Sequence, residues 1–264
     1  MNFLDMPKRT TGNRTFGLTS IADFGIPVGQ LRCILDDYHS YIDVAKLGVG
    51  SAYVTPNLDE KIKLYKQYGI KVYCGGTLFE KCYYQGKLNE YKRFLQKHEV
   101  EWIEVSNGTF DIPLETRLDL VKELKSDFSV LGEVGSKDQT QELSARSWVL
   151  EMNSLLEAGC KYVITEGRDS GTAGIYNPNG EVKKSILKEL TKQVDINRVI
   201  FEAPTSKQQM FFINTFGPNV NLGNVKIQDA LLLEAERVGL RSETFFMESS
   251  YGTIINKTFA NRME

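Results

Sequence analysis

The sequence is poor in the residue that most often serves as a general base or as a ligand of transition metals. It contains only two histidines, His39 and His98, and each lies near the polar end of a predicted helix. This scarcity argues against a His-based catalytic triad, a histidine-rich metal site and a histidine general base. Any chemistry must therefore depend on lysine, arginine, carboxylates, hydroxyls or a hard metal ion.

Cysteine is also scarce, and its spacing matches no common redox or zinc motif. The four cysteines are Cys33, Cys74, Cys82 and Cys160, and none of them forms a C-x-x-C pair. Cys33 and Cys160 fall in helical patterns, whereas Cys74 falls in an apolar strand pattern. This placement favours free thiols in a reducing cytosol over disulfides or a zinc site.

Long hydrophobic runs and a charge excess of either sign are absent as well. The net charge of −2 gives no electrostatic reason to expect nucleic acid or an anionic membrane as a partner. The polar stretch 1–15 lacks the apolar core of a signal peptide, and no run reaches the length of a membrane span. We therefore expect a cytoplasmic protein that acts on small molecules.

What the chain does contain is a strand pattern followed by a helical pattern, repeated eight times. The expected strands are 15–21, 41–47, 70–74, 102–105, 129–134, 162–165, 199–201 and 220–222. Eight such units in 264 residues predict one α/β domain, a single (β/α)₈ TIM barrel over about 14–246 between an N-terminal arm and a short polar C-terminal tail. The alternative is a doubly wound open sheet, but no G-x-G-x-x-G follows the first strand.

Residues that commonly begin, end or break helices indicate several of the expected helix ends. Asn57 followed by Glu60 forms a capping-box pattern, and Gly69 is expected to end that helix. Helical sequence from 78 to 98 is expected to break around Gly86. Pro113 opens a further helix, because its missing N–H costs nothing there.

Four consecutive predicted strands end with a glutamate in the same phase, namely Glu104, Glu133, Glu166 and Glu202. Parallel barrel strands bring such residues to the C-terminal mouth, where barrel active sites lie. Clustered carboxylates repel one another unless cations compensate them or some hold protons. A hard divalent ion, most simply Mg²⁺, would meet this need. The alternative is a set of structural ion pairs with nearby lysines and arginines.

Cations and backbone donors suited to an anionic ligand lie along the same rim. The stretch 165–176 places a guanidinium, hydroxyls and three glycines directly after a strand, although a plain loop held by an Arg168–Asp169 pair would also explain it. The candidate substrate-binding residues are Lys46, Ser170, Gly171, Asn107, Gly223, Asn224 and Lys207. The candidate catalytic residues are Lys137 and Arg168.

Six motifs together resemble the phosphosulfolactate synthase family over about 16–241. They are Gly75-Gly76-Thr77-Leu78-Phe79-Glu80, Val105-Ser106-Asn107-Gly108, Glu133-Val134-Gly135-Ser136-Lys137-Asp138, Glu166-Gly167-Arg168-Asp169-Ser170-Gly171, Phe201-Glu202-Ala203-Pro204 and Phe216-Gly217-Pro218-Asn219-Val220-Asn221-Leu222-Gly223-Asn224. The resemblance implies a (β/α)₈ barrel that adds sulfite to phosphoenolpyruvate in a Mg²⁺-dependent reaction. It also implies a product, phosphosulfolactate, that is used for coenzyme M or for sulfolactate.

The resemblance implies roles for two groups of residues. Mg²⁺ and nearby cations would stabilise negative charge on the substrate carboxylate, and Lys137 matches the position of the family's proposed proton donor. A lowered pKa would suit that role. The chain departs from the family pattern at Ser136, where lysine is usual, and at Asp169, where glutamate is usual.

Other functions stay open at this point. A different phosphate-handling barrel, such as an aldolase or an enolase-like isomerase, would share many of these features. A catalytically silent barrel that binds a phosphorylated metabolite is a third possibility, because a barrel fold alone implies no function. Aromatic residues such as Tyr83, Tyr84 and Phe245 suggest an interface, so we expect a homo-oligomer.

Overall fold

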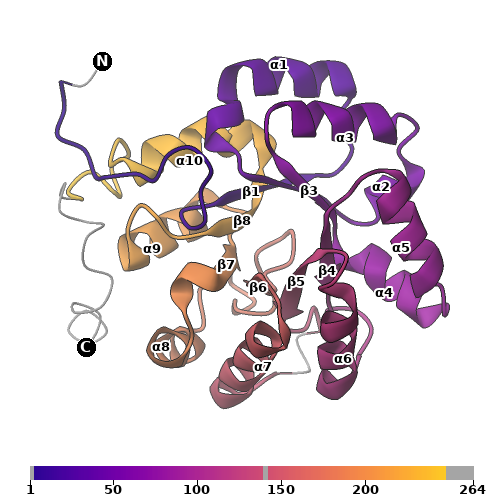
Figure 1. Cartoon of the computed structure of the whole chain (residues 1–264). Coiled ribbons are helices and arrows are strands. Elements are labelled where there is room, and N and C mark those ends of the chain that lie inside the picture. Colours follow the sequence, from indigo (N-terminus) through magenta and orange to yellow (C-terminus); the bar gives the residue numbers. More distant parts are fainter. Residues whose placement is uncertain (1–2, 139–141, 248–264) are drawn as a thin grey trace.

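Eight parallel strands form a closed barrel at the centre of the computed structural model, which describes residues 3–138 and 142–247 (Figure 1). Neighbouring strands follow the chain order, and the barrel closes where the first strand pairs with the eighth. The strands are β1 (Thr19–Asp23), β2 (Val44–Leu47), β3 (Lys71–Cys74), β4 (Trp102–Val105), β5 (Ser129–Val134), β6 (Tyr162–Thr165), β7 (Val199–Glu202) and β8 (Leu222–Lys226). The predicted (β/α)₈ barrel is confirmed, and the open sheet is excluded.

Helices surround the strands and cover their outer faces (Figure 1). They are α1 (Val28–Tyr38), α2 (Ser51–Val54), α3 (Leu58–Gln67), α4 (Gly76–Tyr84), α5 (Leu88–Lys97), α6 (Leu114–Leu124), α7 (Ala145–Ala158), α8 (Lys184–Gln193), α9 (Ser206–Phe216) and α10 (Ala230–Arg237). The described chain also forms short 3₁₀ helices, η1 (His39–Tyr41), η2 (Ile196–Arg198) and η3 (Ile227–Asp229). In the described part of the chain, no helix combines the length and apolarity needed to cross a membrane.

The barrel interior has an apolar lower half, toward the amino ends of the strands, and a charged upper half, toward their carboxyl ends. Alternate residues of a strand point to the same face, so Trp102, Leu131 and Tyr162 lie on the inner face of their strands. They belong to a small buried cluster of the interior, Leu18, Val44, Tyr73, Trp102, Leu131, Tyr162, Ile164 and Ile200. The inner faces of β2, β4, β5 and β7 then continue toward the carboxyl ends of the strands with a charged residue, and Glu166 directly follows β6 in the same phase. A larger apolar cluster fills the space between the strands and the helices.

Three strands differ from the sequence-based prediction by more than one residue. β2 begins at Val44 rather than at residue 41, because residues 39–41 form the 3₁₀ helix η1. β1 begins at Thr19 rather than at residue 15, because Gly17 adopts a positive φ of 76° and turns the chain before the strand. β8 begins at Leu222 rather than ending there, so Gly223 and Asn224 lie inside the strand and not after it. A register shift between β1 and β8 accommodates this irregular strand, in which Asn224 has a φ of 55°.

The predicted helix ends are mostly confirmed. The break at Gly86, the end at Gly69 and the start after Pro113 all occur as expected. The capping box at Asn57 is wrong, because its side chain makes no capping hydrogen bond. The four cysteines are free thiols, as predicted, but Cys160 lies just after α7 and not within a helix. Most of the polar C-terminal tail lies outside the described residues.

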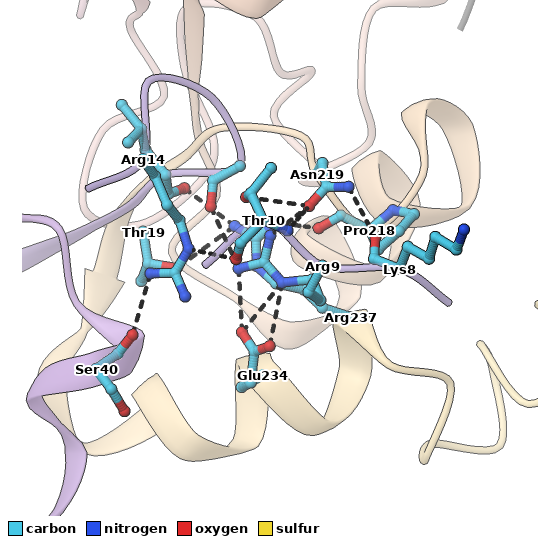
Figure 2. Close-up of polar contacts among 12 residues, drawn as sticks. Lys8, Arg9, Thr10, Arg14, Thr19, Ser40, Pro218, Asn219, Glu234 and Arg237 are labelled. Carbon is cyan, nitrogen blue, oxygen red and sulfur yellow. Dashed lines mark hydrogen bonds and ion pairs between the residues drawn. The ribbon is translucent and has the colours of Figure 1, made fainter. Parts of the chain in front are cut away.

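An N-terminal arm, residues 7–17, crosses the end of the barrel opposite the mouth and joins three elements there (Figure 2). Arg9 forms an ion pair with Glu234 of α10 at 3.1 Å and donates from Nη1 to Asn219 Oδ1 at 2.8 Å. Arg14 pairs with Asp43 at 3.1 Å, just before β2. Arg237, fully buried, donates to the carbonyls of Pro218 and Val220 at 2.7 Å each. These contacts hold the seam between β1 and β8.

We predict that Arg9→Ala lowers the free energy of unfolding by about 2–4 kcal/mol, because Glu234 would lose its partner in a largely buried setting. Urea denaturation measures this loss. The matched control is Arg32→Ala, which removes a 4.0 Å pair with Glu60 between side chains that are 51% and 58% exposed. Its effect should stay within about 0.5 kcal/mol. Equal losses in the two variants would show that the arm does not hold the seam.

Candidate active site

The four in-phase glutamates occupy the upper layer of the barrel interior. Glu104 lies in β4, Glu133 in β5 and Glu202 at the end of β7, while Glu166 directly follows β6. All four side chains are buried. Carboxylate oxygens of Glu133, Glu166 and Glu202 lie within 4.8 Å of one another. The alternation of the strands thus brings these residues together above the apolar half of the interior.

Two lysines neutralise part of this negative charge. Lys46 Nζ of β2 lies 2.7 Å from Glu202 Oε1 and 4.0 Å from Glu104 Oε2. Lys137 Nζ, from the loop after β5, lies 3.6 Å from Glu166 Oε2. The alternative of structural ion pairs is therefore realised for these two lysines. However, both oxygens of Glu104, both of Glu133 and Oε2 of Glu166 have no hydrogen-bond partner among the described residues.

Burial and mutual repulsion divide the carboxyl groups into two kinds. Burial raises the pKa of Glu104 well above its ordinary value, against the opposing charge of Lys46. Burial, together with the charges of Glu133 and Glu202, also raises the pKa of Glu166. Burial acts in the same direction on Glu133, but the charges of Lys137 and Lys46 outweigh it and lower its pKa to about 2. The protein alone thus favours protons on part of the cluster.

The charges around Lys137 act in the opposite direction to the sequence-based expectation. Burial alone would lower the pKa of this ammonium, but the charges of Glu133 and Glu166 dominate and raise it. The expected lowered pKa is therefore wrong. The error has a physical cause, because the nearest charges that Lys137 faces are carboxylates and not the other cations of the rim.

A cavity of about 210 Å³ opens above the cluster. Its lining combines Lys46, Lys137, Glu166, Glu202, Arg168 and Asn224 with the ring of Phe24. The polar groups come from the carboxyl ends of several different strands, the usual arrangement of a barrel active site. A space this small and this charged suits a small anion better than an apolar ligand.

The loop from Glu166 to Lys183 folds back over Glu166. The Arg168 N–H donates to Glu166 Oε1 at 2.5 Å, and Arg168 adopts a left-handed conformation with a φ of 58°. The Ile175 N–H donates to the Glu166 carbonyl at 2.9 Å. A Cβ at Gly174 would lie 1.9 Å from that carbonyl oxygen, so only glycine allows this approach. Arg168 and Asp169 do not pair with each other, so an ion pair between them does not explain this loop.

The other candidate substrate-binding residues divide into two groups. Asn107 Oδ1 is buried in the loop after β4 without a described partner, and Gly223 packs beside Glu202. In contrast, Lys207 is exposed on α9, and Ser170 is exposed and shares a hydrogen bond with Thr172. The Gly171 carbonyl accepts a hydrogen bond from Gln208. None of these last three residues lines the cavity described above.

Glu80 is a further buried carboxylate that the sequence analysis left without a role. It lies on α4, is 3% exposed, and accepts hydrogen bonds from residues of the loop that follows β4. A charged residue next to the buried Leu78 and Phe79 of a helix was the available signal. Phe24 was also missed, because a single aromatic after a strand carries no specific pattern.

Comparison with known proteins agrees with this architecture. Residues 7–243 match the family described as "(2R)-phospho-3-sulfolactate synthase (ComA)". A phosphosulfolactate synthase of Bacillus subtilis is 40% identical over 92% of this chain and 98% of its own length. One of Methanocaldococcus jannaschii is 43% identical over 87% of this chain and 94% of its own.

A solved structure of different sequence shares the fold. The crystal structure of 3-hexulose-6-phosphate synthase from Salmonella typhimurium aligns with a TM-score of 0.52 at 15% identity, over 83% of this chain and 92% of the other. This likeness supports the barrel fold alone. The family match, in contrast, spans every motif quoted above. The alignments with the two relatives cover nearly the whole length of each relative. The chain belongs to the phosphosulfolactate synthase family.

Proposed function

We propose that this protein is a carbon–sulfur bond-forming lyase, a phosphosulfolactate synthase that adds sulfite to phosphoenolpyruvate and requires Mg²⁺. The product would be (2R)-O-phospho-3-sulfolactate. The observation that carries the proposal is the cluster of four buried glutamates and two lysines beneath a small cation-lined cavity, in a chain of this family. The substrates and the metal come from the family resemblance, and the arguments below concern how the residues suit them.

The glutamate cluster suits a divalent cation in both charge and ligand type. Four carboxylates face the ammonium groups of Lys46 and Lys137, so a fully ionised cluster has two negative charges in excess. Its unpartnered oxygens are the hard ligands that Mg²⁺ prefers. We propose that Glu133, Glu166 and Glu202 hold the ion, with Glu104 beside them. When bound, Mg²⁺ would stabilise negative charge that develops on the substrate carboxylate.

The cationic lining suits the two acidic groups of phosphoenolpyruvate. Arg168 offers a planar fork of donors that matches phosphate or carboxylate, and Lys46 and Lys137 supply further positive charge. Asn224 adds a neutral polar group to this lining. These residues would orient the substrate so that its methylene carbon is open to sulfite.

The proposed reaction needs no nucleophile from the protein, which agrees with the scarcity of histidine. The sulfur lone pair of sulfite forms the C–S bond at the methylene carbon, and the π electrons of the double bond move toward the carboxylate. Lys137 then gives a proton from Nζ to the carbon that carries the phosphate, and the phosphate ester stays intact. Glu133 and Glu166 keep the Lys137 ammonium protonated before the addition.

The experiment that tests this proposal follows the reaction by phosphorus NMR. Purified protein is mixed with phosphoenolpyruvate and sulfite, with and without Mg²⁺. We expect a phosphosulfolactate signal that requires the metal. Binding of phosphoenolpyruvate without turnover would instead favour another barrel reaction or a metabolite sensor. The absence of both binding and turnover would refute the proposal.

We predict that Lys137→Ala lowers kcat by about 100-fold or more, because the variant loses its proton donor. Its fold, followed by circular dichroism, should be retained, since the side chain lies at the cavity and not in the apolar core. The control Lys66→Ala removes a lysine of an exposed pair with Glu99 and should leave kcat unchanged. Wild-type turnover in the Lys137 variant would exclude it as the acid.

We also predict that Glu133→Gln and Glu166→Gln each weaken Mg²⁺ binding by about tenfold or more, because each removes a charged oxygen ligand. Isothermal titration calorimetry with Mg²⁺ alone measures this without reference to turnover. Glu123→Gln, on the outer surface in α6, serves as the control. Unchanged affinity in both site variants would place the metal elsewhere.

A further inference from the structure

A buried carboxylate outside the cavity organises the loop that contacts Lys137. Glu80 of α4 accepts four hydrogen bonds from residues 106–110, which connect β4 to α6. Its Oε1 accepts from Ser106 Oγ at 2.5 Å and from the Gly108 N–H at 3.2 Å. Its Oε2 accepts from the N–H groups of Thr109 at 2.8 Å and Phe110 at 2.5 Å. One side chain thus satisfies three backbone donors of a segment without regular structure.

The loop in turn contacts the proposed proton donor at two points. The Gly108 carbonyl accepts a hydrogen bond of 3.0 Å from the Lys137 N–H. A Cβ at Gly108 would lie 3.2 Å from Lys137 Nζ and 2.9 Å from Glu166 Oε2. The backbone of Gly108 therefore packs against both members of the Lys137–Glu166 ion pair. A shift of this backbone would move the main chain of Lys137. It would also change the space available to the ammonium group of Lys137.

We propose that Glu80 is a positioning residue, which fixes the 106–110 loop and through Gly108 sets the place of Lys137 against the substrate. The proposal rests on the function proposed above. Glu80 does not line the cavity, so it would act mainly through the loop. Its charge also helps to raise the pKa of Lys137, but it contributes less than Glu133 and Glu166. Because proton transfer is sensitive to distance and alignment, a small displacement of the donor lowers turnover more than it lowers binding.

The test compares Glu80→Gln with wild-type protein. Glutamine has nearly the same shape, but its amide group presents N–H donors where a carboxylate oxygen accepted them. At least one backbone N–H of the loop therefore loses its acceptor, Gly108 in one amide orientation or Thr109 and Phe110 in the other. We expect kcat to fall about tenfold or more, while KM for phosphoenolpyruvate changes less than threefold. The control is Glu90→Gln, on the neighbouring helix α5, where Glu90 pairs with Lys87 in an exposed position.

Two further measurements separate positioning from a general loss of structure. Hydrogen exchange followed by mass spectrometry should show faster exchange at residues 106–110 and at the Lys137 amide in Glu80→Gln, with the other strands unchanged. Gly108→Ala keeps Glu80 intact but crowds Lys137 directly, and it should lower kcat by a similar factor. Both results would support the proposal.

Three outcomes would overturn it. Turnover of Glu80→Gln within twofold of wild type would show that the loop does not control the reaction. A fall in turnover that only follows a lower folded fraction would assign Glu80 a structural role. Wild-type turnover in Gly108→Ala would show that Gly108 does not control the position of Lys137. The exchange measurement needs no substrate, so a failure of the proposed reaction would be seen separately in the wild-type protein.

Discussion

The burial of four carboxylates inside one end of the barrel is the constraint on which the rest of the site depends. In a low-dielectric interior their repulsion is strong, and each unpartnered oxygen costs free energy. Lys46 and Lys137 offset part of this cost through ion pairs of 2.7 and 3.6 Å. Negative charge that remains on the cluster would attract a divalent cation, as the proposed Mg²⁺-dependent reaction requires.

Close backbone approach keeps this charged layer enclosed. A Cβ at Gly76 would lie 2.4 Å from Glu104 Oε1, and one at Gly174 would overlap the Glu166 carbonyl. The segments after β3 and β4 therefore pack directly on carboxylates, through Gly76 on Glu104 and Gly108 on Glu166, and water has limited access to them. Charge interactions are stronger in such a setting than at an exposed surface. The same packing explains why a carboxylate outside the cavity, Glu80, can affect groups inside it.

The sequence predicted those parts of the structure that depend on local pattern. β4, β5 and β6 have the predicted bounds because each is an apolar run with clear ends. The glutamates could be grouped because strand alternation and parallel order are enough to place them. Glu80 could not be assigned, since its partners lie 26 to 30 residues away. The pKa of Lys137 was also beyond reach, because sequence does not show which charges a side chain faces.

The apolar and charged layers of the barrel interior have opposite effects on stability. Along a strand, a residue of one layer lies only two positions from a residue of the other. Leu131 belongs to the apolar half of the interior and Glu133 to the charged half, and Ile200 and Glu202 repeat this arrangement. The charged layer destabilises the fold, so the apolar layer and the contacts at the opposite end must compensate. The arginine contacts of the N-terminal arm and of Arg237 in α10 lie at that opposite end, where they hold the barrel seam without entering the site. This separation allows the mouth to keep a strained, charged arrangement while the base of the barrel stabilises the fold.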